Sequence, residues 1–383
     1  MHIGLDGIPL ATPKSGIGHY TFELAKSLAE LAPTDEFELI APVEVDSDEG
    51  ALPGNLRVKH ILVNSLRRRW WTIGLPLYVR QQQLALYHGT NYNVPLWRRC
   101  PTVVTIHDLS LLLHPETHRE DLVSRARRRL PTMTRIAAHV ITDSESVKKE
   151  IHQHLGTAEE KVTAVPLAPR RSFHPGAEGE VRDTLKRLNV EDEFILFVGT
   201  VEPRKNLITL VRAFDELMRE TDLRPQLVIA GQKGWLTDEL YSYVEQSALK
   251  DRVLFTGYIS DDDLRALYSS CRAAVYPSLY EGFGLPPLEA MACGAPVITS
   301  RIPVIMETSE GAATLINPTN VSELTRALIE LLTNEAKRRE LRGLGLRRAS
   351  EYTWELTAKR TYEVYKCVLN ANKKAGDYQS PAL

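Results

Sequence analysis

The sequence has few cysteines and no long apolar segment. Its four cysteines, Cys100, Cys271, Cys293 and Cys367, lie far apart, and no Cys-x-x-Cys pair or histidine cluster accompanies them. This spacing disfavours a disulfide scaffold and a structural zinc site. Free thiols suit a reducing compartment, and Met1–Leu10 has the alternation of a strand instead of a secretory signal, so we expect a cytoplasmic protein. No run of about eighteen apolar residues could form a membrane-spanning helix.

A strong excess of charge of one sign is also missing. The chain has 47 Lys and Arg against 49 Asp and Glu, a formal net charge of −2, with 43% apolar and 25% charged residues. This is the composition of an ordinary globular protein, and it gives no overall attraction to nucleic acid. At roughly 150 residues per domain, the 383 residues predict two or three domains.

Short apolar runs alternate with amphipathic stretches in two successive series, which is the pattern of β-α units around parallel sheets. The runs of the first series are His2–Asp6, Phe37–Ala41, Arg57–Leu62, Leu84–His88, Thr102–His107 and His139–Thr142, and those of the second are Phe194–Val198, Gln226–Ala230, Val253–Thr256, Ala273–Pro277, Pro296–Thr299 and Ala313–Ile316. Helix breakers are densest between the two series, over Pro166–Gly179, where we place a domain boundary. Residues 322–370 have helical periodicity and could reach back over the first domain.

The most informative segment reads PSLYEGFGLPPLEAMACG, from Pro277 to Gly294. It follows a strand and opens a helix, so its glycines and the helix N-terminus suit a phosphate. Glu281 in the loop and Glu289, expected in the first helical turn, would accept hydrogen bonds from the hydroxyls of one ligand. The alternative is a solvated loop glutamate and a glutamate that only favours the helix dipole.

This Glu-x7-Glu string resembles the signature of the retaining, nucleotide-sugar-dependent glycosyltransferases with two Rossmann domains, the glycogen synthase-like and mannosyltransferase-like family. The resemblance implies the GT-B fold, in which two Rossmann-like α/β domains face each other across a cleft. Residues 1–170, with a C-terminal helix at about 356–372 crossing back, would form the acceptor domain, and residues 171–355 the donor domain. Its donor contacts would include Gly282, Phe283, Gly284, Leu285 and Glu289.

Further segments resemble the donor-binding loops of this family. Arg204 and Lys205 follow the first strand of the second series, where paired cations would neutralise the donor diphosphate. Taken alone, such a pair is more often a surface feature. Two later strand ends carry the residues that resemble nucleoside-binding positions: Gly231, Lys233, Tyr258 and Ile259.

Two positions of the first half resemble family sites. Gly16 matches a glycine loop near the donor phosphates, and His107 stands at a strand end, where family members have a histidine that contacts the donor sugar. A lone histidine is otherwise more often structural. NAD is disfavoured, because the fingerprint would need Gly or Ala at Thr21 and an acid at the end of the second strand.

Three consecutive acids, Asp261, Asp262 and Asp263, resemble the metal-binding Asp-x-Asp motif of other sugar transferases. They also begin an amphipathic helix, where negative charge favours the helix dipole, and we prefer that interpretation. We therefore expect no metal or other cofactor, with Arg204 and Lys205 supplying the positive charge.

Basic residues are concentrated in two places of the first half. Arg67–Trp71 and Arg125–Arg129 combine arginines with aromatic or apolar neighbours, as surfaces that meet anionic lipid do. Solvated helix faces are the alternative.

The resemblance implies a retaining hexosyltransferase, with GDP-mannose as the first expected donor and a glycan or lipid-linked glycan of surface-polysaccharide assembly as the acceptor. His107, Arg204, Lys205 and Glu281 would do the catalytic work, and nucleic acid is not expected as a partner. One alternative is a sugar-nucleotide 2-epimerase, which shares the architecture but lacks the Glu-x7-Glu string. Another is a non-catalytic subunit that binds a nucleotide-sugar.

Overall fold

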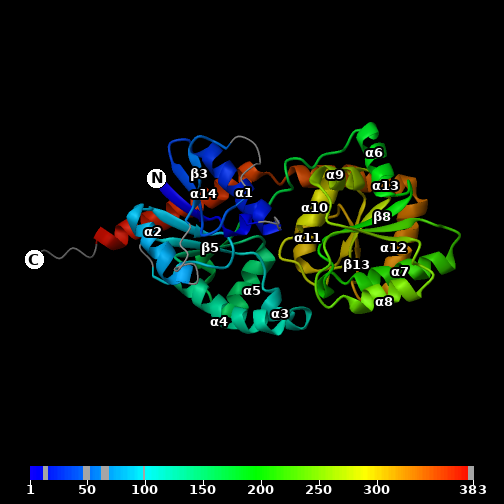
Figure 1. The fold of residues 1–383 in the computed structure, drawn as a ribbon, viewed down its shortest axis with the longest axis horizontal. Coiled ribbons are helices and arrows are strands. Elements are labelled where there is room, and N and C mark those ends of the chain that lie inside the picture. Colours follow the sequence, from blue (N-terminus) through cyan, green and yellow to red (C-terminus); the bar gives the residue numbers. More distant parts are fainter. Residues whose placement is uncertain (12–15, 46–51, 62–68, 98–99, 378–383) are drawn as a thin grey trace, which may run out of the picture. The chain divides into compact units, whose positions relative to one another are not determined.

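The protein is described from a computed structural model of residues 1–11, 16–45, 52–61, 69–97 and 100–377. The chain divides into two compact units (Figure 1). Unit 1 comprises 1–109, 124–167 and 353–383, and unit 2 comprises 110–123 and 168–352. Each unit has one sheet in which every pairing that the structure describes is parallel, which confirms the predicted α/β fold class.

Unit 1 is built on a seven-stranded sheet in the order β3-β2-β1-β4-β5-β6-β7. Its strands are β1 His2–Asp6, β2 Glu36–Ala41, β3 Leu56–His60, β4 Leu86–Gly89, β5 Thr102–Ile106, β6 His139–Thr142 and β7 Val162–Ala164. The main helices are α1 Gly16–Leu31, α2 Leu75–Gln81, α4 Glu120–Ile136, α5 Glu145–Leu155 and α14 Trp354–Asp377, and a π-helical turn, η3 Trp70–Gly74, precedes α2. The sequence pattern did not predict β7, a strand of three residues.

Unit 2 is built on a six-stranded sheet in the order β10-β9-β8-β11-β12-β13. Its strands are β8 Phe194–Val198, β9 Gln226–Ala230, β10 Val253–Gly257, β11 Ala273–Tyr276, β12 Val297–Ser300 and β13 Thr314–Ile316. The main helices are α6 Glu178–Leu188, α7 Leu207–Glu220, α8 Asp238–Gln246, α9 Asp261–Ser270, α10 Leu285–Ala292, α11 Pro303–Ser309, α12 Val321–Thr333 and α13 Glu335–Ser350, and the short helix α3 Ser110–Leu113 also lies in this unit. All six predicted runs of this half form strands, shifted by at most one residue at an end.

The strand order of unit 2 places a topological switch point between β8 and β11. There the connections leave the sheet in opposite directions, and a crevice opens at the carboxyl ends of the two strands. Both strands lie in the middle of the sheet, and the side chains of Phe194–Phe197 in β8 are completely buried. A rigid central strand therefore carries the loop that follows it.

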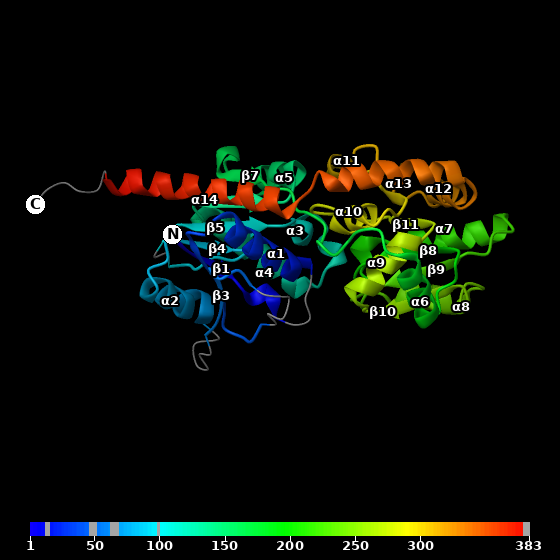
Figure 2. The same cartoon turned by 90° about the horizontal axis from the view of Figure 1, so that it is seen from above.

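The C-terminal helix α14 belongs to unit 1 and lies beside α1 (Figures 1 and 2). The Tyr365 hydroxyl is 2.6 Å from His88 Nδ1, both side chains being fully buried, and the Tyr362 hydroxyl donates to Asp35 Oδ2 at 2.6 Å. The predicted return of this helix to the first half of the chain is confirmed. It is longer than the expected 356–372, because α14 begins at Trp354 and ends at Asp377.

The segment Ser110–Val123 was expected in the first domain, but it groups with unit 2. The indole Nε1 of Trp235 donates to the Thr117 carbonyl oxygen at 2.7 Å, and His114 packs on Tyr280 with 5.1 Å between ring centroids. These contacts join the segment to unit 2, although in the sequence it lies between β5 and β6 of unit 1. The other divisions fall between Leu167 and Ala168 and between Tyr352 and Thr353, where the sequence had suggested 170 and 355.

The sequence composition also led to expectations about disulfides and membrane-spanning helices. None of the four cysteines is in a disulfide. Over the described part of the chain, no helix is both long and apolar enough to cross a membrane.

Candidate active site

Three of the predicted catalytic side chains of unit 2 meet in one buried cluster. Lys205 Nζ donates to Glu281 Oε1 at 2.7 Å, and Arg204 Nη1 donates to Glu281 Oε2 at 3.2 Å. Arg204 also donates to the Tyr280 carbonyl oxygen at 2.9 Å and to Glu202 Oε1 at 2.6 Å. The sequence did not identify Glu202 as a partner. The side chains of Lys205, Arg204 and Glu281 are only 10–13% exposed, so the cluster is a small preformed network.

The backbone brings this cluster together at the switch point of the sheet. Arg204 and Lys205 lie in a short 3-10 turn, Pro203–Lys205, that follows β8, and Glu281 lies in the loop that follows β11. Leu279 N donates to the Arg204 carbonyl oxygen at 2.9 Å, which joins the two loops directly. Asn206, with a left-handed φ of 55°, adds a side-chain bond to the Pro277 carbonyl oxygen at 3.0 Å.

The electrostatics of the cluster keep Glu281 ionised. Burial alone would raise the pKa of Glu281, but the adjacent Lys205 and Arg204 outweigh it and lower that pKa to about 2. A carboxylate in this state can only accept hydrogen bonds, which suits it to hold hydroxyl groups. Both cations, Arg204 and Lys205, have carboxylate partners in the structure. Glu281 and Glu202 already hold them in place.

Glu289 has a different cation partner, Arg170. Nε and Nη2 of Arg170 donate to the two carboxylate oxygens of Glu289 at 2.8 and 3.0 Å, and Nη1 donates to Asp261. The Glu289 side chain is 2% exposed. It lies in the second turn of α10, not in the first turn as expected, because the helix begins at Leu285. The two glutamates of the Glu-x7-Glu string are therefore held by separate cations.

The other predicted donor-binding residues of unit 2 lie in loops after neighbouring strands. Gly231 and Lys233 follow β9, Tyr258 and Ile259 follow β10, and Gly282, Phe283, Gly284 and Leu285 follow β11 at the start of α10. Since β10, β9, β8 and β11 are adjacent and parallel, these loops share one edge of the sheet with Arg204 and Lys205.

Two glycines of these loops cannot be replaced without strain. A Cβ atom at Gly231 would lie 2.0 Å from the Gly199 carbonyl oxygen, so only glycine lets the two backbones approach. Gly284 has a φ of 88° at the N-cap of α10, where a Cβ atom would lie 2.5 Å from Ile305 Cδ1.

In unit 1, His107 follows β5 and both its ring nitrogens have partners. Nδ1 is 2.8 Å from Asp143 Oδ2, and Nε2 is 2.9 Å from the Thr90 carbonyl oxygen. Because the carbonyl can only accept, Nε2 is the donor, and a proton also lies between Nδ1 and the carboxylate. Burial opposes the charged ring, but Asp143 outweighs it and raises the pKa of His107. Gly16, the other predicted residue of this unit, is exposed at the start of α1.

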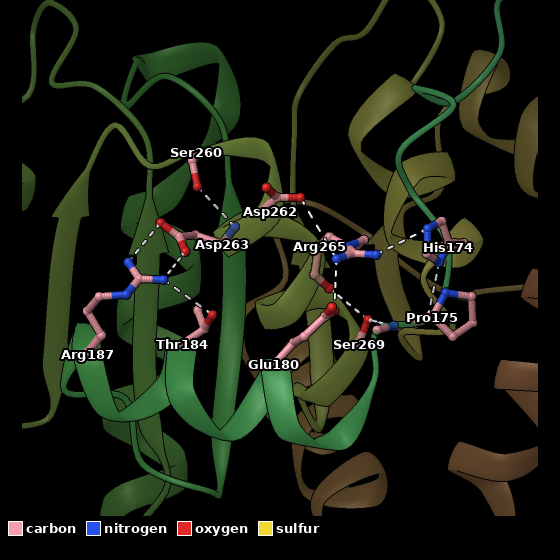
Figure 3. Close-up of polar contacts among 11 residues, drawn as sticks. His174, Pro175, Glu180, Thr184, Arg187, Ser260, Asp262, Asp263, Arg265 and Ser269 are labelled. Carbon is pink, nitrogen blue, oxygen red and sulfur yellow. Dashed lines mark hydrogen bonds and ion pairs between the residues drawn. The ribbon is translucent and has the colours of Figure 1, made fainter.

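The three acids at Asp261–Asp263 form the first turn of α9. Figure 3 shows two of them, Asp262 and Asp263. Ser260 caps the helix by accepting from the Asp263 amide at 3.2 Å. Asp263 is paired with Arg187, and this hydrogen bond is the main reason why the pKa of Asp263 is lowered. Asp262 lies 3.8 Å from Arg265, and Asp261 is paired with Arg170. The helix-start interpretation is confirmed, and each carboxylate faces an arginine.

Two family models match successive parts of the chain. Residues 14–168 match the family model described as Glycosyltransferase Family 4, and residues 183–345 match the one described as Glycosyl transferases group 1. The chain is 31% identical over 378 residues to O-antigen chain mannosyltransferase B of Escherichia coli, with 94% of this chain and 97% of that protein covered. The chain belongs to the glycosyl transferases group 1 family.

Solved structures support the GT-B fold of this glycosyltransferase. Sucrose-phosphate synthase from Thermosynechococcus elongatus matches with a TM-score of 0.77 and 22% identity, covering 97% of this chain and all of that one. HepE of Anabaena in complex with UDP-glucose matches with a TM-score of 0.73 and 19% identity, covering 96% of this chain and 99% of that one. The predicted family and enzyme class are confirmed.

Sequence reasoning missed three residues that hold the predicted site residues of this glycosyltransferase. Arg170 lies in the breaker-rich segment that was treated only as a boundary, Asp143 directly follows β6, and Glu202 precedes the Arg-Lys pair. Asp143 could have been found from its place, since β6 neighbours β5 and the ends of adjacent parallel strands lie together. No local signal marks Arg170, because its partner Glu289 is 119 residues away.

Proposed function

We propose that this glycosyltransferase transfers mannose from GDP-mannose, with retention at the anomeric carbon, to a hydroxyl of a glycan or lipid-linked glycan in surface-polysaccharide assembly. The observation that carries the proposal is the Lys205–Glu281–Arg204 cluster at the switch point of the unit 2 sheet. The choice of mannose is supported by the O-antigen chain mannosyltransferase relative.

In the proposed reaction, the bond between mannose C1 and the diphosphate oxygen breaks, and the electron pair stays with that oxygen. The acceptor oxygen bonds to C1 from the same face, and its proton passes to the leaving phosphate, so GDP is released. Arg204 and Lys205 stabilise the negative charge on the diphosphate, and Glu281 accepts hydrogen bonds from the sugar hydroxyls. Positive charge comes from these side chains, and no metal is required.

The other predicted site residues bind further parts of the donor. Glu289 accepts hydrogen bonds from the ribose, with Arg170 holding its carboxylate in one orientation. His107 contacts the donor sugar. The loops that carry Gly231, Lys233, Tyr258 and Ile259 bind the nucleoside.

A donor panel tests the proposal. GDP-mannose, GDP-fucose, UDP-glucose and UDP-galactose are offered with methyl α-mannoside, and both nucleotide release and the anomeric configuration of the product are followed by NMR. We expect release of GDP with an α-linked product from GDP-mannose. Lys205→Met should abolish transfer, whereas Lys250→Met, which changes an exposed lysine paired with Glu245, should not. Conversion of the nucleotide-sugar without nucleotide release would indicate the epimerase instead, and binding without turnover would indicate a non-catalytic subunit.

We also propose that the protein acts in the cytoplasm in peripheral contact with an anionic membrane, through the two arginine-rich segments. Arg67 and Arg68 lie outside the described residues. Arg69 is exposed, and the segment Arg125–Arg129 lies on α4 with three of its four arginines exposed. Sedimentation with phosphatidylglycerol vesicles tests this contact. Binding should fall steeply as salt rises, since the Debye length shortens from about 30 Å at 0.01 M to about 8 Å at 0.15 M. Absence of binding at low salt would reject it.

A further inference from the structure

The two arginine-rich segments, more than fifty residues apart in the sequence, converge on one pocket of unit 1. The pocket has a volume of about 420 Å³, within the roughly 300–1,000 Å³ of small-molecule sites. Its lining residues are Arg69, Trp71, Thr72, Leu96, Arg128, Arg129, Thr132 and Met133. They come from the π-helical turn η3 and Arg69 just before it, from the segment between β4 and β5, and from α4.

Specific contacts hold these three elements together. Leu96 N donates to the Trp71 carbonyl oxygen at 3.4 Å, which ties the β4–β5 segment to η3. Val94 N lies 3.5 Å from Met133 Sδ, which ties the same segment to α4. Trp70 is 3% exposed and packs in the core, so the turn that carries Arg69 and Trp71 is anchored. The pocket therefore lies where three elements are held together by specific contacts.

The lining of the pocket combines cationic and apolar side chains. Among the described residues, the lining contains three arginines and no acidic residue, and no ion pair joins these arginines to a carboxylate. Burial, and next the neighbouring Arg125, lower the pKa of Arg129, as expected for crowded cations. The apolar side chains of the lining are Trp71, Leu96 and Met133. A smaller cavity lined by Leu77 and Trp97, which are 48% and 69% exposed, shares Thr72 with the pocket.

We propose that this pocket binds the phosphate group and the first carbons of a long-chain alkyl phosphate, the lipid end of a lipid-linked acceptor. Guanidinium groups match the oxygens of a phosphate in charge and geometry, and the tryptophan, leucine and methionine side chains bury a hydrocarbon chain. The assignment rests on the proposed function, because it names the acceptor class for that transfer.

Calorimetric titration with three probes tests the binding. Dodecyl phosphate below its critical micelle concentration carries both groups, inorganic phosphate carries only the anion, and dodecyl maltoside carries only the chain. We expect dodecyl phosphate to bind at least about tenfold more tightly than either of the other probes, because only dodecyl phosphate contacts both the arginines and the apolar side chains. Equal affinity for inorganic phosphate would overturn the lipid assignment, and equal affinity for dodecyl maltoside would overturn the phosphate assignment.

Variants test whether the two segments form one site. Arg69→Gln and Arg128→Gln should each weaken dodecyl phosphate binding by about threefold to tenfold, and their combined effect should be less than the product of the two. Arg135→Gln is the matched control, since Arg135 lies two turns along the same face of α4 but does not line the pocket. The proposal fails if Arg135→Gln weakens binding as much as Arg128→Gln does.

A transfer assay separates failure of the pocket from failure of the proposed function. Mannose transfer is measured to methyl α-mannoside and to a mannose joined to dodecanol through a phosphodiester. Arg128→Gln should lower the ratio of transfer to the second probe over the first. An unchanged ratio would overturn the pocket assignment alone, whereas no transfer to either probe by the wild-type protein, with dodecyl phosphate binding intact, would overturn the proposed function alone.

Discussion

Replacing Lys205 with methionine removes the closest cation from Glu281 while keeping the length of the side chain. The pKa of Glu281 lies at about 2 against an ordinary value of 4.5, a difference of about 2.5. At about 1.36 kcal/mol for each pKa unit, the folded protein favours the ionised carboxylate by about 3 kcal/mol. Lys205 and Arg204 share this effect, and the side chains are nearly buried, so solvent screens it little. We expect Lys205→Met to lower the free energy of unfolding by about 2 kcal/mol at pH 7.

The lowered pKa of Glu281 determines how the stability effect of Lys205→Met changes with pH. The folded pKa of Glu281 is depressed, so its contribution to stability is complete above pH 4.5 and is lost as the pH falls toward 2. The difference in stability between the wild type and Lys205→Met should therefore shrink on acidification through this range. Urea unfolding at pH 7 and near pH 4, followed by circular dichroism, measures it.

A double-mutant cycle separates the ion pair from other effects of the substitution. Adding Glu281→Gln to Lys205→Met should cost less than the sum of the two single changes, because the second change removes the carboxylate that the first left without its nearest cation. If Lys205→Met unfolds like the wild type at both pH values, or if the two changes are additive, the assignment of the depressed pKa to this pair is wrong.

Three further predictions concern other parts of the chain. Arg170→Met leaves the carboxylate of Glu289 buried without its cation, so the free energy of unfolding should fall by about 3–5 kcal/mol. GDP should also bind more weakly in calorimetry, with partial recovery in Arg170→Lys. Unaltered GDP affinity would contradict the ribose role of Glu289. Tyr365→Phe leaves buried His88 Nδ1 without a partner, which should cost about 1–3 kcal/mol in thermal unfolding, and an unchanged melting temperature would show that this contact does not anchor α14. EDTA should leave mannose transfer intact, whereas a loss that manganese restores would assign a metal to the Asp261 carboxylate and its neighbours.

Much of the fold could be predicted because hydrophobic periodicity is a local property. Apolar runs between glycines and prolines marked twelve of the thirteen strands, and the helical tail was recognised from its repeat. The Glu-x7-Glu string and the Arg-Lys pair were found as short motifs, since each lies within one loop and its adjoining helix. The grouping of Ser110–Val123 with unit 2 has no local signal, because it depends on Trp235, a residue far along the chain.

The amino-acid sequence by itself determined the two α/β series, the family and most of the residues that we assign to the site. Only the tertiary structure decided which charges meet. Glu281 lies 76 residues from Lys205, and the two side chains meet because β8 and β11 are neighbours in the sheet. Glu289 lies 119 residues from Arg170, and these two side chains form hydrogen bonds between α10 and the segment that precedes α6. The joining of Arg69 and Arg128 in one pocket is likewise a product of packing between η3 and α4. A charged side chain gives no sign of its partner in the sequence, since ion pairing depends on distance in space and has no periodicity along the chain.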